Sequence, residues 1–234
     1  MAQPSFARVK EVFEQWSMYD TVVRADYMCH AEIDTALTRW GAEQTKPLRI
    51  IDLGCGDSGM ATAAWSAANV ASYRGVDVSE ASIERAREHV QIWQGRAEVS
   101  AGNLADFVHS LATGSANVVL ASYTIHHFST EAKVSLIVDI HRVLARDGSF
   151  IWIDAVRNDG ESRDAYIARL IHEMERDWMA LTNDQRAAAC THVRESDFPE
   201  PRGWMLKQVA AAGFKTSETI LQNKFFDGWV FTKD

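Results

Sequence analysis

An eight-residue segment in the first quarter of the chain combines carboxylates and glycines in a spacing that suits ligand binding. Residues Asp52 to Gly59 read D-L-G-C-G-D-S-G and follow the apolar run L-R-I-I-D-L. The glycines match the pattern G-x-G-x-x-G, in which the backbone turns sharply and its N–H groups approach a bound ligand. A second acid, Asp77, ends the next apolar run, where a carboxylate can accept hydrogen bonds from ribose hydroxyls. The pattern predicts an adenosine-containing ligand and leaves its identity open.

The elements that must position this segment alternate between apolar runs and helical patterns. Strands are expected at 48–53, 72–78, 97–102, 117–123 and 149–156, and helices at 60–69, 80–93 and 130–145. Strands separated by helices predict βαβ units and a mostly parallel sheet. A helix at 199–214 and a hairpin of two strands, 219–221 and 225–231, follow. The sequence therefore predicts an α/β fold with a Rossmann-like, doubly wound, seven-stranded sheet.

A helical cap is expected at residues 1–46, before the first strand. Its first apolar stripe consists of Val9, Val12, Phe13 and Trp16. A second stripe runs from Val22 to Trp40, and Asp20 is the expected N-cap between the two segments.

A second helical region interrupts the alternation after the fifth strand. Residues 161–195 predict two amphipathic helices with no strand between them. In open α/β sheets the ligand binds beyond the carboxyl ends of the strands. We therefore interpret residues 157–200 as a helical lid, inserted into a ligand-binding domain that spans residues 47–234.

Composition narrows the class of protein. The 234 residues carry 24 basic and 32 acidic side chains, a net charge of −8, which argues against a dedicated nucleic-acid binder. The three cysteines form no CxxC pair, and no cluster of His, Asp and Glu has metal-ligand spacing, so no disulfide framework and no metal are expected. The absence of a signal-peptide pattern and of a long apolar run predicts a cytoplasmic protein with no membrane contact. A monomer or homodimer is expected.

Five motifs together resemble one enzyme family. They are I-D-L-G-C-G-D-S-G at 51–59, G-V-D-V-S at 75–79, A-G-N-L at 101–104, V-V-L-A-S-Y-T-I-H-H-F at 118–128 and H-R-V-L-A-R-D-G-S-F-I-W-I-D at 141–154. In this order they are similar to the motifs of class I S-adenosylmethionine-dependent methyltransferases. The resemblance covers about residues 48–156 and implies S-adenosylmethionine as the cofactor.

The resemblance implies a role for each matching residue. Asp52 would lie near the amino acid end of the cofactor, and Asp77 would hold both ribose hydroxyls. Asn103 stands where many relatives carry Asp, and its side chain can still accept from the adenine amino group. The remaining cofactor positions are Gly54, Cys55 and Gly56 under the methionine moiety, Val78 and Leu104 at the adenine, and Ser122 and Tyr123 beside the transferred group.

Side chains at the strand ends and in the two helical regions are candidates for catalysis and acceptor binding. His126 and His127 follow the fourth strand, where either could act as a general base, or the pair could pack and cap the loop. Tyr123 is the third catalytic candidate. The candidates for acceptor binding are Tyr27, His30, Asp154, Tyr166 and Trp178, and for each the alternative is a purely structural role.

The function expected from these residues is methyl transfer from S-adenosylmethionine to a small-molecule acceptor. One alternative keeps the cofactor and breaks another bond, by aminocarboxypropyl transfer or by a cyclisation that releases methylthioadenosine. A second alternative is a cofactor-binding protein without catalysis. A nicotinamide-dependent dehydrogenase is the third, because the glycine pattern and Asp77 also suit a dinucleotide.

Overall fold

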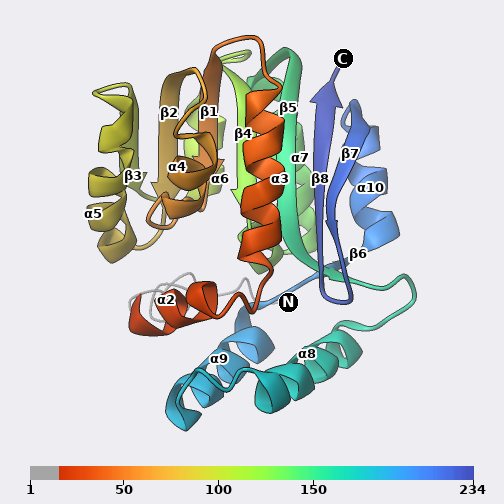
Figure 1. Ribbon diagram of the computed structural model, residues 1–234. Helices are drawn as coiled ribbons and strands as arrows, with labels where there is room; N and C mark the ends of the chain where they lie inside the picture. Colours follow the sequence, from red (N-terminus) through yellow and green to blue (C-terminus); the bar gives the residue numbers. More distant parts are fainter. Residues whose placement is uncertain (1–15) are drawn as a thin grey trace.

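The fold is seen in a computed structural model that describes residues 16–234. In this part of the chain an eight-stranded sheet forms the centre of the molecule, with strand order β3-β2-β1-β4-β5-β8-β7 and β6 paired to β5 alone (Figure 1). The strands are β1 (Leu48–Leu53), β2 (Val70–Asp77), β3 (Ala97–Ala101), β4 (Ala116–Ser122), β5 (Leu144–Arg157), β6 (Glu200–Pro201), β7 (Phe214–Gln222) and β8 (Phe226–Lys233).

The strand order reverses next to β1. Strands β1 to β3 run outward in one direction, and β4 and β5 then continue on the other side of β1. Neighbours among β1 to β5 are parallel, whereas β8 is antiparallel to both β5 and β7. In such a sheet the ligand site lies at the carboxyl ends of the strands beside the reversal, here β1 and β4.

Helices cover both faces of the sheet and its carboxyl edge (Figure 1). One face carries α3 (His30–Ala42), α4 (Gly59–Trp65) and α5 (Glu80–His89), with the 3-10 helix η1 (Val90–Trp93). The other face carries α6 (Leu104–Ser110), α7 (Thr130–Val143) and α10 (Arg202–Ala211). Below the carboxyl edge lie α2 (Trp16–Arg24), α8 (Arg163–Asp177) and α9 (Asn183–Ser196), and the 3-10 helix η2 (Ile125–His127) follows β4. Among the helices of residues 16–234, none is long and apolar enough to cross a membrane.

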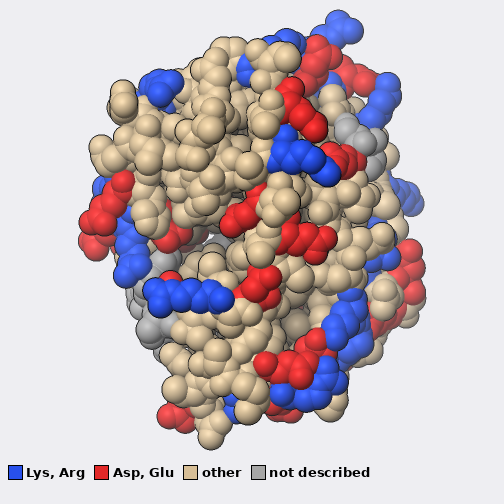
Figure 2. Space-filling model, viewed as in Figure 1, with Lys and Arg blue, Asp and Glu red and all other residues tan. Residues whose placement is uncertain are grey.

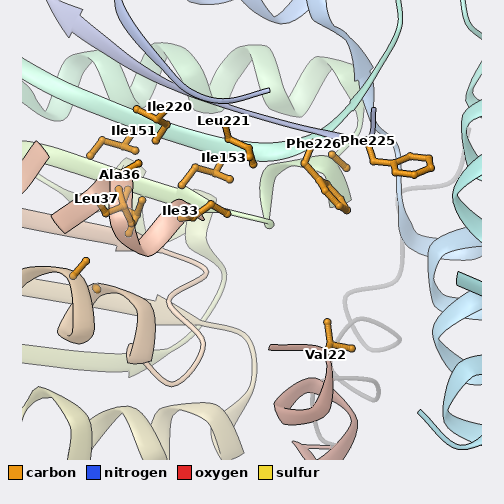
Figure 3. Packing of buried hydrophobic residues seen from close by; sticks show 14 of the residues in the cluster. Val22, Ile33, Ala36, Leu37, Ile151, Ile153, Ile220, Leu221, Phe225 and Phe226 are labelled. Atoms are coloured by element: carbon orange, nitrogen blue, oxygen red, sulfur yellow. The ribbon is translucent and has the colours of Figure 1, made fainter. Parts of the chain in front are cut away.

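Two apolar clusters, one on each face, hold the layers together. Ile33 and Leu37 of α3 are fully buried and lie over Ile151 and Ile153 of β5 (Figure 3). Because β1, β4 and β5 are buried on both faces, their sequences read as continuous apolar runs. Burial of one such side chain stabilises the fold by about 1.5–3 kcal/mol, so this packing is what holds the strand ends in place.

The mixed α/β fold with a mostly parallel sheet is confirmed, but the sequence gets four local features wrong. The expected strand count of seven omits β6, a two-residue strand that exists only because Val156 of β5 lies opposite Glu200. Strand β5 begins at Leu144 instead of 149, since Leu144 pairs with Ala116 of β4. Helix α6 has no counterpart among the expected helices.

The fourth difference concerns the N-terminal helices. Asp20 lies inside α2, where it pairs with Arg24 at 2.7 Å, and is not an N-cap. The chain breaks between α2 and α3 because Asp26 and Cys29 adopt left-handed backbone angles, with φ of 55° and 60°. The Asp26 carboxylate then accepts from the Ala31 N–H at 3.0 Å. The expected stripe at Val9, Val12 and Phe13 lies outside the described residues.

Candidate functional site

A cavity opens at the carboxyl edge of the sheet, between this edge and the helices α2, α8 and α9. Figure 2 shows that this face of the molecule is hollowed between the body of the sheet and the helices below it, with basic and acidic side chains intermixed around the opening. The cavity wall includes Gly54, Gly56, Asp77, Val78, Asn103, Leu104 and Ser122 on the sheet side. The opposite side includes Tyr19, Met28, His30, Leu170, Met174, Trp178, His192 and Val193. Tyr123, His126, His127 and Asp197 also line the cavity.

The turn after β1 requires glycine at position 54. Gly54 has φ of +69°, and a Cβ there would lie 2.3 Å from Thr124 Oγ1. Gly56 also has a left-handed φ of +54°, but a Cβ built on it meets no atom within 4 Å. Both residues line the cavity, so the turn offers bare backbone and open space to a ligand. This fits the cofactor expected from the sequence.

Asp77 is held at the centre of the sheet-side wall. Its Oδ2 accepts from the Gly56 N–H and its Oδ1 from the Ser79 N–H, both at 2.9 Å. These bonds fix the carboxylate and leave further lone pairs on each oxygen for ligand hydroxyls. Burial raises the pKa of Asp77, although the backbone hydrogen bonds act against this rise.

Asp52 and Cys55, expected beside the cofactor, do not line the cavity. The Asp52 carboxylate lies beneath the turn and accepts from the Tyr73 hydroxyl at 2.7 Å. Burial raises the pKa of Asp52 to about 7. Cys55 packs against Gly75, where a Cβ would come within 2.8 Å of its Sγ, and burial raises the pKa of the thiol well above its usual value. Both residues support the turn from behind.

Asn103 has a structural partner that the sequence analysis did not assign. Its Oδ1 accepts from the Ala105 N–H at 2.8 Å and so caps α6. Asn103, Val78 and Leu104 all line the cavity, as the adenine role requires. The expected acceptor atom of Asn103 is therefore already engaged with the helix.

Tyr123 and His30 meet on the wall opposite the glycine turn. Tyr123 has a left-handed φ of 53°, and its hydroxyl donates to the Met28 carbonyl oxygen. This bond occupies the hydroxyl and ties the end of β4 to the segment between α2 and α3. His30 lies with its ring 5.7 Å from that of Tyr123, and its buried Nδ1 has no hydrogen-bond partner. Burial lowers the pKa of His30, which favours the neutral imidazole.

Trp178 lines the cavity, whereas Tyr27 supports it from outside. The two rings stack at 4.9 Å with an interplanar angle of 4°, and the Tyr27 hydroxyl accepts from the Ala180 N–H at 2.7 Å. Two segments far apart in the chain are thereby joined across the cavity. Tyr166 is fully buried and donates to the Phe225 carbonyl oxygen at 2.9 Å, so it does not reach the cavity.

Asp154 is buried and bound entirely within the protein. Its carboxylate is hydrogen-bonded to His126 Nδ1, and it accepts from the Trp152 indole N–H and the Ala155 N–H, both at 2.9 Å. Asp154 does not line the cavity, so the structure places it behind His126 and away from an acceptor.

Three histidines surround Asp197, a residue that sequence reasoning missed. The Asp197 Oδ1 lies 3.5 Å from His126 Nε2, 3.5 Å from His127 Nδ1 and 3.7 Å from His192 Nε2. Burial by itself lowers the pKa of His126, but the carboxylates of Asp154 and Asp197 raise it to about 10. Burial and the neighbouring His126 lower the pKa of His127 to about 3. Asp197 and His192 stand about seventy residues after the histidine pair, so no local spacing reveals them.

The comparisons with known proteins agree on a family. Residues 50–148 match the model of a methyltransferase domain. The chain is 26% identical over 182 residues to the carboxy-S-adenosyl-L-methionine synthase of Mannheimia succiniciproducens, which covers 76% of this chain and 73% of that protein. The protein of the same name from Pseudoalteromonas atlantica is 26% identical over 189 residues, or 80% of this chain and 72% of that protein.

A solved structure has the same fold over almost the whole chain. The magnesium protoporphyrin IX methyltransferase of Synechocystis, determined with bound SAH, superposes with a TM-score of 0.67 at 14% identity. The superposition covers 98% of this chain and all of that chain. The matched methyltransferase domain and the similarity to carboxy-S-adenosyl-L-methionine synthases decide against the nicotinamide-dependent alternative. Residues 50–148 therefore form an S-adenosylmethionine-dependent methyltransferase domain of class I, and the chain is an S-adenosylmethionine-dependent transferase.

Proposed function

We propose that the enzyme transfers the methyl group of S-adenosylmethionine to a small-molecule acceptor. The acceptor would be held between the carboxyl edge of the sheet and the helices α2, α8 and α9. The observation that carries this proposal is a single cavity whose wall has two parts: a glycine turn with Asp77 on the sheet side, and aromatic and imidazole side chains on the other. A cofactor and an acceptor can meet there without a large opening to solvent. Such enclosure suits a small molecule better than a nucleic acid, and the net charge of −8 supports the same conclusion.

The sheet-side wall would hold the cofactor. The carboxylate of Asp77 would accept from the ribose hydroxyls, and Gly54 and Gly56 would bring backbone N–H groups to the methionine part. Val78 and Leu104 would pack at the adenine with Asn103 beside it, and Ser122 would lie beside the transferred group. The buried Ser122 hydroxyl has no hydrogen-bond partner in the structure, so it can take one from a ligand.

The helix-side wall is the part of the cavity wall opposite the glycine turn and Asp77. It would position the acceptor and take up its proton. When bound, the cofactor supplies a sulfonium-activated methyl group, so alignment and exclusion of water can account for most of the rate. His30 suits the part of base better than the histidine pair, because its buried Nδ1 lacks a partner while His126 is held between two carboxylates. Tyr123 would position His30, and Trp178 would cover the acceptor.

Binding of the cofactor and removal of Asp77 test the first half of the proposal. We expect S-adenosylmethionine to raise the melting temperature of the wild type and to bind about 10- to 100-fold more weakly to Asp77→Asn, through loss of a charge-assisted contact. Asp106→Asn is the matched control, because Asp106 is an exposed acid in the first turn of α6. Equal binding by wild type and Asp77→Asn in calorimetry would contradict the role of Asp77.

A second candidate is a reaction that consumes the cofactor without methyl transfer. It is favoured by the names of the similar curated proteins, carboxy-S-adenosyl-L-methionine synthases, which describe a modified cofactor as the product. Aminocarboxypropyl transfer or cyclisation, with release of methylthioadenosine, belongs to the same class. Mass spectrometry after incubation with S-adenosylmethionine alone tests for the cyclisation, which needs no second substrate. Methylthioadenosine above a blank without enzyme would overturn methyl transfer, whereas intact cofactor would call for a screen of acceptors.

The setting of the enzyme is part of the same proposal. We propose that the enzyme is a cytoplasmic monomer or homodimer. It would act without a nucleic acid or membrane partner, in keeping with a small-molecule acceptor. Size-exclusion chromatography with light scattering measures the oligomeric state.

A further inference from the structure

We propose that His126, His127 and Asp197 form a binding site for a divalent transition-metal ion of the zinc type. One ligand atom from each of the three side chains lies within 4.8 Å of the others, and all three residues are buried. They come from η2 and from the residue that follows α9, so the site joins the sheet edge to the helices below it. The glycine turn and Asp77 belong to a different part of the wall.

The spacing of the donor atoms suits an ion better than direct hydrogen bonds. The distance from His126 Nε2 to Asp197 Oδ1 is 3.5 Å, longer than a good N–H···O bond. Metal–ligand bonds of about 2.0–2.1 Å in a tetrahedral arrangement place two ligand atoms about 3.4 Å apart. The two side chains therefore stand close to the separation that they would have on a shared ion.

A second observation points to a missing partner. Asp197 is 5% exposed, and its Oδ1 is buried without a hydrogen bond inside the described part of the chain. A buried carboxylate oxygen in this state is costly unless something binds it. Asp197 is also one of the residues that line the cavity.

Both histidines use Nδ1 for a partner within the protein, and His126 presents Nε2 to Asp197 whereas His127 has its Nδ1 3.5 Å from Asp197 Oδ1. His126 uses Nδ1 for Asp154, and His127 uses Nδ1 for the Ser196 carbonyl oxygen at 3.0 Å. Ligand histidines commonly donate their second ring N–H to a carboxylate or a backbone carbonyl, which fixes the ring and leaves Nε2 for the ion. Asp154 thus becomes a positioning residue for His126.

The balance of charge favours a divalent ion over a single proton. Asp154 and Asp197 place two carboxylates around His126, and the nearby buried Lys133 is already paired with Glu200 at 3.0 Å. Arg163 donates to the backbone oxygen of Asp197 and lies 3.7 Å from Asp164, so it does not pair with the Asp197 carboxylate. A proton on His126 leaves the group of His126, Asp154 and Asp197 with one net negative charge, whereas a divalent ion neutralises both carboxylates.

An ion at this position would have a free coordination site toward the cavity, since all three ligand residues line it. It could there bind a carboxylate or hydroxyl oxygen of the acceptor. This last step rests on the proposed function, whereas binding of the ion itself does not.

Cobalt(II) is a suitable probe, because its absorption spectrum reports ligand number and type. Purified protein without a histidine tag, stripped with chelator, is titrated with Co²⁺ in the absence of S-adenosylmethionine and then challenged with Zn²⁺. We expect one equivalent of Co²⁺ with a four-coordinate spectrum lacking thiolate bands, and its displacement by Zn²⁺. Saturation without such a spectrum, or no binding, would overturn the proposal.

Variants identify the ligands. His127→Gln and Asp197→Asn should abolish Co²⁺ binding, and Asp154→Asn should weaken it about 10- to 100-fold. His109→Gln is the control, because His109 is an exposed histidine with a carboxylate, Asp139, at 3.1 Å. Unchanged binding by His127→Gln and Asp197→Asn would contradict the assignment. If these variants do not fold, a zinc-soaked crystal of the wild type decides by anomalous diffraction: a peak between the three side chains supports the site, and its absence there overturns it.

Because these measurements use no acceptor and no cofactor, their outcome is independent of methyl transfer. Failure of the metal site leaves the proposed function standing, and failure of methyl transfer leaves the metal site standing.

Discussion

The two parts of the cavity wall are built in different ways. The sheet-side wall comes from short turns after neighbouring parallel strands, and its key bonds join Gly56, Asp77 and Ser79. The helix-side wall joins segments far apart in the chain: Tyr27 meets Ala180, and His126 meets Asp197. The first wall depends on backbone conformation, whereas the second depends on side-chain pairs across tertiary contacts. Substitutions should therefore damage the two walls by different mechanisms.

The largest effect is expected where the helix-side wall is tied to α7. Lys133 is 1% exposed and bonds to Glu200 and to the Phe198 carbonyl oxygen. Lys133→Met should lower the free energy of unfolding by about 3–5 kcal/mol, because it removes the buried ammonium group from the Glu200 carboxylate, which keeps only the Thr130 hydroxyl at 2.7 Å and Arg157 at 4.0 Å among the described residues. Chemical denaturation measures the loss. The double variant Lys133→Met/Glu200→Gln should recover part of it, and a double variant as unstable as the single one would refute this account.

The next effect concerns the backbone of the sheet-side wall. Gly54→Ala should cost about 3 kcal/mol, since it adds a clash with Thr124 to the strain of a left-handed φ. Gly56→Ala is the matched control, because it has a similar φ and open space around the added Cβ, so only about 1–2 kcal/mol is expected. Thermal unfolding of both variants without cofactor makes the comparison. Equal losses would show that contact with Thr124 does not matter.

Asp52 should make stability depend on pH. Its pKa is raised by burial to about 7, well above its value of about 4 in an unfolded chain, so between these values the folded state holds a proton that the unfolded state has released. Raising the pH from 5 to 7 should therefore lower the stability of the wild type by about 2 kcal/mol through this group. Asp52→Asn should lose this slope while Asn still accepts from Tyr73. Parallel slopes in urea denaturation at the two pH values would disprove it.

The smallest effect is expected for Tyr27, which joins the N-terminal segment to the region after α8. Tyr27→Phe keeps the stack on Trp178 and loses one hydrogen bond to the Ala180 N–H, for a cost of about 1 kcal/mol. Tyr27→Ala removes the stack as well and should cost more. Hydrogen exchange at residues 178–182 should quicken in both variants. Unchanged exchange in Tyr27→Ala would mean that this contact does not hold the helices closed.

Much of the sheet and of the sheet-side wall could be predicted because their signals are local. The apolar runs, the glycine spacing and the position of Asp77 lie within single βαβ units, and each has a direct physical meaning. The errors have equally specific causes. Asn103 is the N-cap of α6, a local signal that its expected ligand role obscured, and Asp20 lies inside α2 although its residue type also suits a cap.

The surroundings of the histidine pair, in contrast, could not be predicted from local signals. Sequence reasoning left His126 and His127 open between a general base and a loop cap, named Asp154 as a candidate acceptor contact, and found no metal-ligand spacing. The structure instead packs Asp154 behind His126 and brings Asp197 in from a region about seventy residues away. These relations depend on how α9 docks against the end of β4, which no pattern of neighbouring residues encodes.

The sequence by itself determined the alternation of strands and helices, the turn that only glycine can form, and the carboxylate that faces it. Each of these follows from backbone geometry and hydrophobic periodicity over a few residues. Only the tertiary structure decided which side chains face the cavity from below, which of its acids and imidazoles are already paired, and that Asp197 Oδ1 has no hydrogen bond within the described residues. Those properties depend on burial and on distances between elements, and the free energy of a buried charge is set by everything packed around it.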